Sequence, residues 1–116
     1  MNKPAKSYLT MINNRQRFLN FLGIAQRAGR IISGEDSLRK RIKAHQIKFL
    51  VVASDAGSVT DKKFHDKAAS HRIPINDQFT KDELSHAIGN YRTVIGIADR
   101  GFVSRLIELN QKIKGQ

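Results

Sequence analysis

The stretch FLVVA at residues 49–53 decides the fold, because it is a continuous apolar run without alternation. A strand that is buried on both faces has this pattern, since both alternating sets of its side chains meet a core. A second run of this kind, TVIGIA, occupies residues 93–98. The two runs predict buried strands in a sheet that carries helices on both faces.

Apolar residues at helical spacing and further short apolar runs predict the elements on either side. The capping box Thr80-Lys81-Asp82-Glu83 marks a helix start, and Pro74 favours a sheet edge for its strand. Alternating strands and helices are typical of an α/β fold with a mostly parallel or mixed sheet. The predicted order is α-β-α-β-α-β-α-β-α, with helices at 14–28, 35–44, 60–71, 80–89 and 99–113 and strands at 30–33, 49–53, 73–75 and 93–98.

The chain has 116 residues, which suits a single domain. Residues 1–13 contain Pro4 and show no sustained period, so they are predicted to be a flexible basic N-terminal tail before one domain at 14–116. Either Met1 or Met11 could be the start site. No apolar run reaches the ~18 residues of a membrane span, and there is no cysteine. We therefore expect a soluble, cytoplasmic protein without a membrane partner.

The charge of +11 is unevenly distributed along the chain. Residues 1–50 contain 11 Lys and Arg against 2 Asp and Glu, whereas residues 51–116 contain 10 against 8. A charge excess that serves solubility alone need not gather in one half. The first half is therefore predicted to form a basic patch for a polyanion, most simply a nucleic acid.

Catalytic and metal-binding patterns are absent from the sequence. The histidines His45, His65, His71 and His86 include no pair at i, i+4, and no HExxH, GxSxG, GxxxxGK[ST] or GxGxxG motif occurs. We expect no catalytic residue, no metal, no cofactor and no enzymatic activity.

The segment SGEDSLRKRIK at 33–43 is the first candidate binding site. Gly34 leads into a helix N-terminus with free N–H groups, but Glu35 and Asp36 in its first turn would repel a phosphate placed there. Carboxylates only accept hydrogen bonds, so they suit the donor groups of a base edge. Lys40, four residues after Asp36, could reach an adjacent base acceptor or phosphate. The alternative is a solvated helix with an Asp36–Lys40 ion pair.

The segment GNYRT at 89–93 is the second candidate. It offers an amide, an aromatic face and a guanidinium in succession, which are groups that stack on or bind unpaired bases. The alternative is an ordinary turn between a helix and a strand, with a half-buried tyrosine.

Three stretches, LGIAQRAGRIISGEDSLRKRI (22–42), FLVVASDA (49–56) and VIGIADRGFVSRLIEL (94–109), together resemble one family. This family is the kink-turn RNA-binding ribosomal proteins of the Ae-type large-subunit group, with its small bacterial YlxQ-type branch. The resemblance implies a three-layer α-β-α sandwich around a four-stranded mixed sheet. It also implies RNA contacts at Gly34, Asp36, Ser37 and Lys40 and at residues 89–93. Kink-turn binders usually carry Asn-Glu where this chain has Asp36-Ser37, and a largely apolar second loop.

The sequence thus predicts a monomeric, ribosome-associated protein that binds structured RNA, ribosomal or kink-turn in kind. Two other functions stay open: a stand-alone domain that presents RNA to a partner methyltransferase, and a basic adaptor for an acidic protein. The predicted RNA-binding residues are Arg30, Ser33, Gly34, Glu35, Asp36, Ser37, Arg39, Lys40, Arg41, Lys43, Gly89, Asn90, Tyr91 and Arg92.

Overall fold

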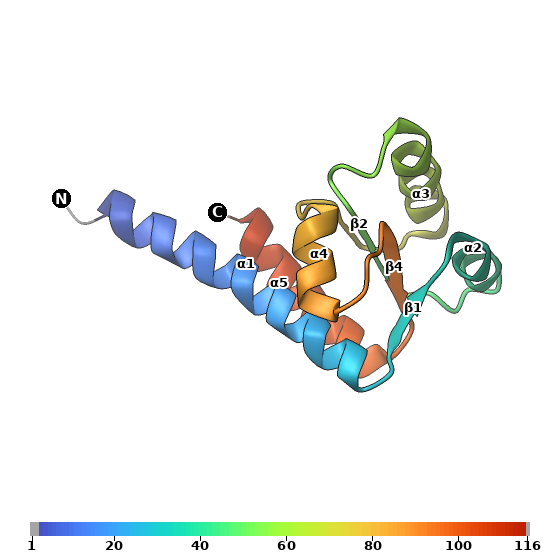
Figure 1. Ribbon diagram of the computed structural model, residues 1–116, viewed down its shortest axis with the longest axis horizontal. Coiled ribbons are helices and arrows are strands. Elements are labelled where there is room, and N and C mark those ends of the chain that lie inside the picture. The colour runs from blue at the N-terminus through green and yellow to red at the C-terminus, as the bar shows by residue number, and fades with distance from the viewer. Residues whose placement is uncertain (1–2, 116) are drawn as a thin grey trace.

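A computed structural model describes residues 3–115, with side chains from residue 8 onward. The predicted order of five helices and four strands is confirmed (Figure 1). The helices are α1 (Lys3–Arg27), α2 (Glu35–Lys43), α3 (Ser58–His71), α4 (Lys81–Ile88) and α5 (Arg100–Lys114). The strands are β1 (Ile31–Ser33), β2 (Phe49–Val52), β3 (Ile75–Asn76) and β4 (Val94–Ile97).

The four strands form one mixed sheet in the order β1-β4-β2-β3. β4 runs antiparallel to both β1 and β2, and β2 runs parallel to β3. The two apolar runs are the inner strands, and every residue of β2 and β4 is buried. β3 lies at the sheet edge, as Pro74 predicts, but the strand begins at Ile75 because the N–H of Ile73 closes the end of α3 on the carbonyl of Ala68.

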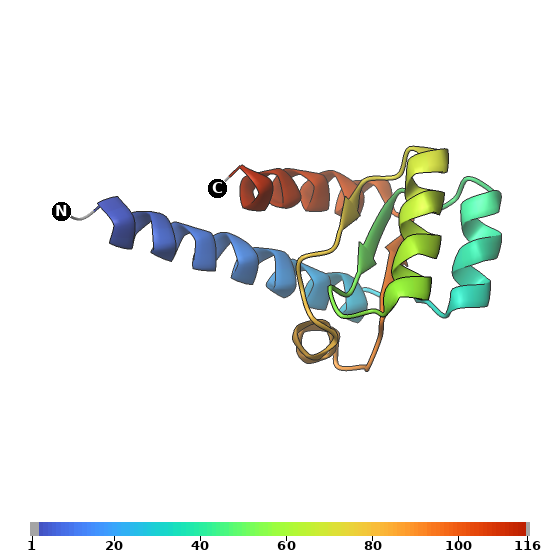
Figure 2. The same ribbon diagram turned by 90° about the horizontal axis from the view of Figure 1, so that it is seen from above.

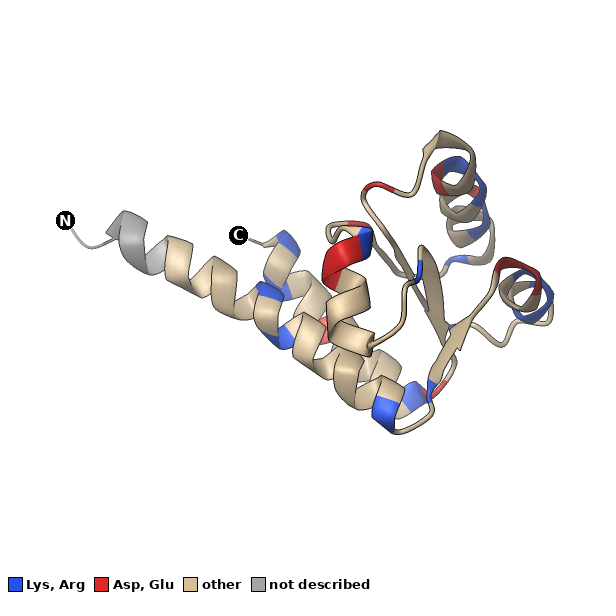
Figure 3. Ribbon diagram, in the orientation of Figure 1, with Lys and Arg blue, Asp and Glu red and all other residues tan. Residues whose placement is uncertain are grey.

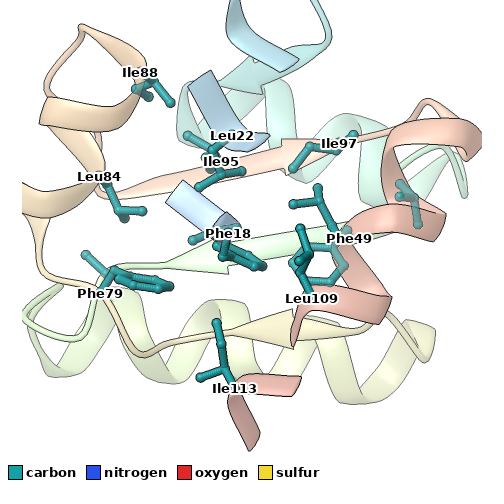
Figure 4. Packing of buried hydrophobic residues seen from close by; sticks show 14 residues of the cluster. Phe18, Leu22, Phe49, Phe79, Leu84, Ile88, Ile95, Ile97, Leu109 and Ile113 are labelled. Carbon is teal, nitrogen blue, oxygen red and sulfur yellow. The ribbon is translucent and has the colours of Figure 1, made fainter. Parts of the chain in front are cut away.

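Helices cover both faces of the sheet, which confirms the three-layer α-β-α sandwich (Figure 2). α1, α4 and α5 pack on one face, where Phe49 and Val51 of β2 meet them; Figure 4 shows this cluster. α2 and α3 pack on the other face, against Leu50 and Val52. The strand alternates between two separate cores, and this explains why its sequence shows no polar residue.

Gly96 in β4 allows α2 to lie close to the sheet. A Cβ atom at this position would lie 2.6 Å from Cδ2 of Leu38 and 3.2 Å from Cδ1 of Ile47. Leu38 is fully buried and anchors α2. The absence of a side chain at Gly96 therefore sets the depth at which the first candidate binding segment sits.

The first helix begins at Lys3, so the predicted start at Asn14 was wrong. Pro4 is compatible with this start, because the first turn of a helix needs no N–H donor from that position. Tyr8, Leu9 and Ile12 are exposed, and these turns extend away from the rest of the molecule (Figures 1 and 2). Because these first turns contact no core, their sequence has no amphipathic pattern from which a helix could be predicted. The flexibility expected for residues 1–13 stays a prediction, and residues 1–2 lie outside the described residues.

Candidate nucleic-acid interface

The two candidate segments meet at one end of the sheet, here called the Ser33 end. The register pairs Ser33 with Ile95 and Val52 with Val94, so β1 and β2 finish where β4 begins. Residues 89–93 lead into β4 at this end, and Gly34 leads from β1 into α2. The Ser33 end thus gathers the loops that precede β4 and follow β1 and β2.

Arg92 joins the two segments directly. Its Nε donates a hydrogen bond of 2.9 Å to Oγ of Ser33, and its Nη1 donates one of 2.8 Å to the carbonyl of Tyr91. The guanidinium therefore holds the loop in a fixed position beside the start of α2. Residues that are 59 positions apart in the sequence become neighbours on one surface.

Gly34 makes the sharp turn from β1 into α2 with φ of 93°, a conformation that side chains disfavour. Both carboxylates of the first turn are paired: Glu35 accepts a hydrogen bond of 3.2 Å from Nζ of Lys63, and Asp36 is bonded to Arg39. Asp36 thus forms an i, i+3 pair with Arg39, and the Asp36–Lys40 ion pair of the alternative interpretation does not form. Among the residues whose side chains are described, Lys40 has no ion-pair partner.

Tyr91 projects from the loop into solvent. The residue is 61 % exposed, so the half-buried alternative does not hold. Nζ of Lys81 lies 6.0 Å from the ring centroid, at the limit of a cation–π contact. Gly89, which caps the C-terminus of α4, and Asn90 directly after it are both exposed. An aromatic face next to cations is available for stacking.

Two predicted site residues do not join this surface. Arg30 precedes β1 and so lies at the opposite end of the sheet, where its Nε is 3.8 Å from Oδ2 of Asp99. Arg41 is on the side of α2 away from α3, about 160° around the helix from both Arg39 and Lys43, which face α3. The other predicted residues lie around the Ser33 end or on the sides of α2 that Arg41 does not share. They are Ser33, Gly34, Glu35, Asp36, Ser37, Arg39, Lys40, Lys43, Gly89, Asn90, Tyr91 and Arg92.

The expected basic patch of the first half is divided by the sheet. Arg15, Arg17 and Arg27 belong to α1, which covers the face opposite to α2. Sequence reasoning predicted the helix at 60–71 but did not assign α3 to the binding surface, since the second half has an almost balanced charge. Lys63 of α3 donates to Glu35 of α2, and Lys67 lines a groove with residues of α2, so only the fold brings them there. Figure 3 shows Lys and Arg positions in blue on both helices.

The described residues contain no helix that is long and apolar enough to cross a membrane. Over the same residues, no group of three or more His, Cys, Asp or Glu side chains could hold a metal ion.

The fold and the polar loops at the Ser33 end define a small basic α-β-α binding domain. Residues 16–102 match the Ribosomal protein L7Ae/L30e/S12e/Gadd45 family. The chain belongs to this family, which confirms the resemblance seen in the sequence.

Two relatives carry the name RNA-binding protein YlxQ. The Enterococcus faecium protein is 38 % identical over 96 residues, 83 % of this chain and 93 % of the relative. The Bacillus subtilis protein is 36 % identical over 89 residues, 76 % of this chain and 89 % of the relative.

Solved structures show the same fold. A Bacillus halodurans protein described as one with unknown function has a TM-score of 0.76 at 37 % identity, over 81 % of this chain and 96 % of its own. The Giardia lamblia 15.5kD RNA binding protein has a TM-score of 0.70 at 14 % identity, over 89 % of both chains, and this likeness shows the fold alone.

Proposed function

We propose that this protein binds structured RNA, with ribosomal RNA as its partner, and that it acts in the cytoplasm by binding rather than by catalysis. The observation that carries the proposal is the 2.9 Å hydrogen bond between Arg92 and Ser33, which unites both candidate segments on one surface. Membership of a ribosomal protein family and two relatives named RNA-binding proteins support it.

The Ser33 end offers separate groups for phosphates and for bases. Lys40 carries an uncompensated charge for a phosphate, because Asp36 is bonded to Arg39. The Asp36 side chain is 82 % exposed, so its carboxylate can also accept hydrogen bonds from the amino and imino groups of a base. Tyr91 can stack on an unpaired base. In this arrangement phosphate contacts supply affinity and base contacts supply specificity.

Crosslinking the protein to RNA in bacterial cells, followed by sequencing of the bound RNA, tests the proposal. We expect enrichment of a defined site in ribosomal RNA. Partners that survive nuclease treatment of a pull-down, without enrichment of RNA, would instead indicate the adaptor function.

A charge-removal variant tests the role of Lys40. Because the substitution removes the cation that meets one phosphate, Lys40→Ala should bind ribosomal RNA fragments about fourfold more weakly at about 150 mM salt. Lys112→Ala is the control, because Nζ of Lys112 is 4.0 Å from Glu108 on the opposite face of the sheet. Equal effects of the two substitutions would contradict the assignment of Lys40 to the interface.

A further inference from the structure

A basic groove runs between α2 and α3 and leads away from the Ser33 end. The two helices lie side by side (Figures 1 and 2), and Figure 2 shows that their N-termini are at the same end. Leu38 and Ile42 of α2 and Phe64 and Ala68 of α3 face the sheet. The groove on the outer side has a volume of about 600 Å³ and is lined by Asp36, Arg39, Lys40, Ile42, Lys43, Lys67 and His71.

Positive charge in this α2–α3 groove is largely uncompensated. Asp36 is the one carboxylate among its lining residues, and it is already bonded to Arg39. Lys40, Lys43 and Lys67 have no ion-pair partner within the part of the chain whose side chains are described. Some other helical cations do have carboxylate partners, as Lys62 has Asp66 at 2.8 Å and Arg105 has Glu108 at 2.8 Å.

Like charges at helical spacing repel one another in the free protein. Lys40 and Lys43 are three residues apart on α2, and Lys67 projects into the same groove from α3. Such an arrangement is unfavourable without a counter-charge, and a bound anion relieves it. The imidazole of His71, whose ring centroid is 5.5 Å from that of His45, adds a hydrogen-bond donor at the far end of the groove.

We propose that the α2–α3 groove binds the phosphate backbone of an RNA strand that continues from the Ser33 end. This inference rests on the proposed function and extends it to α3. Asp36, Arg39 and Lys40 belong both to the first candidate segment and to the groove lining, so the two surfaces are continuous. From Asp36 to Lys43 the path along α2 is about 10 Å long. Lysine side chains bind phosphate as point charges without reading sequence, so this part of the surface adds affinity and not specificity.

An RNA backbone fits these observations better than an acidic protein does. The cations line one groove between two parallel helices, and the same lining includes Asp36, an exposed carboxylate suited to bases. An acidic peptide would use the lysines but would leave the base-directed groups without a role.

The test is a double variant, Lys43→Gln with Lys67→Gln, which leaves Lys40 and the Ser33 end intact. Binding of end-labelled, fragmented bacterial ribosomal RNA is measured by filter binding over a range of KCl concentrations. Because two phosphates no longer meet a cation, the slope of log K against log salt should become shallower by about 1.4, and binding should weaken about tenfold near 150 mM KCl.

The control is Lys62→Gln with Lys112→Gln, which removes the same charge from two lysines that lie near Asp66 and Glu108. We expect the control to keep the wild-type slope. Equal thermal stability of both double variants shows that folding is intact.

The alternative outcomes separate the two proposals. Wild-type binding with an unchanged slope in the groove variant overturns the groove and leaves the proposed function standing. No RNA binding by the wild-type protein overturns the proposed function and the groove with it. If the groove variant loses binding to polyglutamate but keeps its affinity for RNA, the groove serves an acidic protein and the inference is wrong.

Discussion

At the scale of single residues, two hydrogen-bond acceptors around His65 on α3 favour the protonated form of its imidazole. Its Nδ1 lies 2.9 Å from the carbonyl oxygen of Asp61, and its Nε2 lies 3.0 Å from Oδ2 of Asp77. Both oxygens can only accept, so a protonated imidazolium that donates from both nitrogens satisfies them together. The hydrogen bond to the Asp61 backbone and then the Asp77 carboxylate raise the pKa of His65, while partial burial opposes the shift.

This raised pKa predicts the pH dependence of stability. The stabilising contribution of His65 is fully present below the unfolded pKa of about 6.5 and is lost as the pH rises through the higher folded pKa. Thermal unfolding should therefore occur at a lower temperature at about pH 8 than at about pH 5.5. His65→Gln should remove part of this difference. An identical pH dependence in the wild-type protein and the variant would show that the two contacts do not hold the proton.

The contact between β4 and α2 controls, at the scale of elements, where the first binding segment lies. Gly96→Ala would place a methyl group 2.6 Å from Cδ2 of Leu38, whose side chain is fully buried. Overpacking of this kind should lower the free energy of unfolding by about 1–3 kcal/mol, measured by urea denaturation.

A double-mutant cycle checks the cause. In Gly96→Ala with Leu38→Ala the methyl group gains space, so the combined loss of stability should be smaller than the sum of the two single losses. Additive losses would show that the strain arises elsewhere in β4.

The elements differ in how well the sequence predicts them, and the difference follows from what each one contacts. β2 and β4 were predicted correctly because burial on two faces leaves an unmistakable apolar run. α4 was predicted from its capping box, in which Thr80 accepts from the N–H of Glu83 at 3.1 Å. The first turns of α1 were missed because Tyr8, Leu9 and Ile12 meet no core.

At the scale of the whole molecule, the sequence predicts which segments bind but not how they assemble. Segments 33–43 and 89–93 carry suitable side chains, yet their proximity depends on the antiparallel pairing of β1 with β4. The same pairing sends Arg30 to the far end and brings Lys63 and Lys67 beside α2. Charge counted along the chain cannot reveal this, because Asp61 and Asp66 on α3 offset those lysines in the count.

At the same scale, the net charge of the protein could attract RNA without any defined contact site. The salt dependence of binding separates this general attraction from local contacts at the Ser33 end. If about four phosphates meet cations at the interface, log K should fall against log salt with a slope of about −3 to −4. Arg17→Gln and Lys40→Gln change the charge of +11 equally, but Arg17 is on α1, across the sheet from α2.

Local binding predicts that Lys40→Gln makes the slope shallower by about 0.7–0.9, whereas Arg17→Gln leaves it unchanged. Filter binding with a single RNA fragment measures both. Attraction by net charge alone predicts equal changes in the two variants. That result would mean that RNA approaches either face of the sheet, and the Ser33 end would lose its special role.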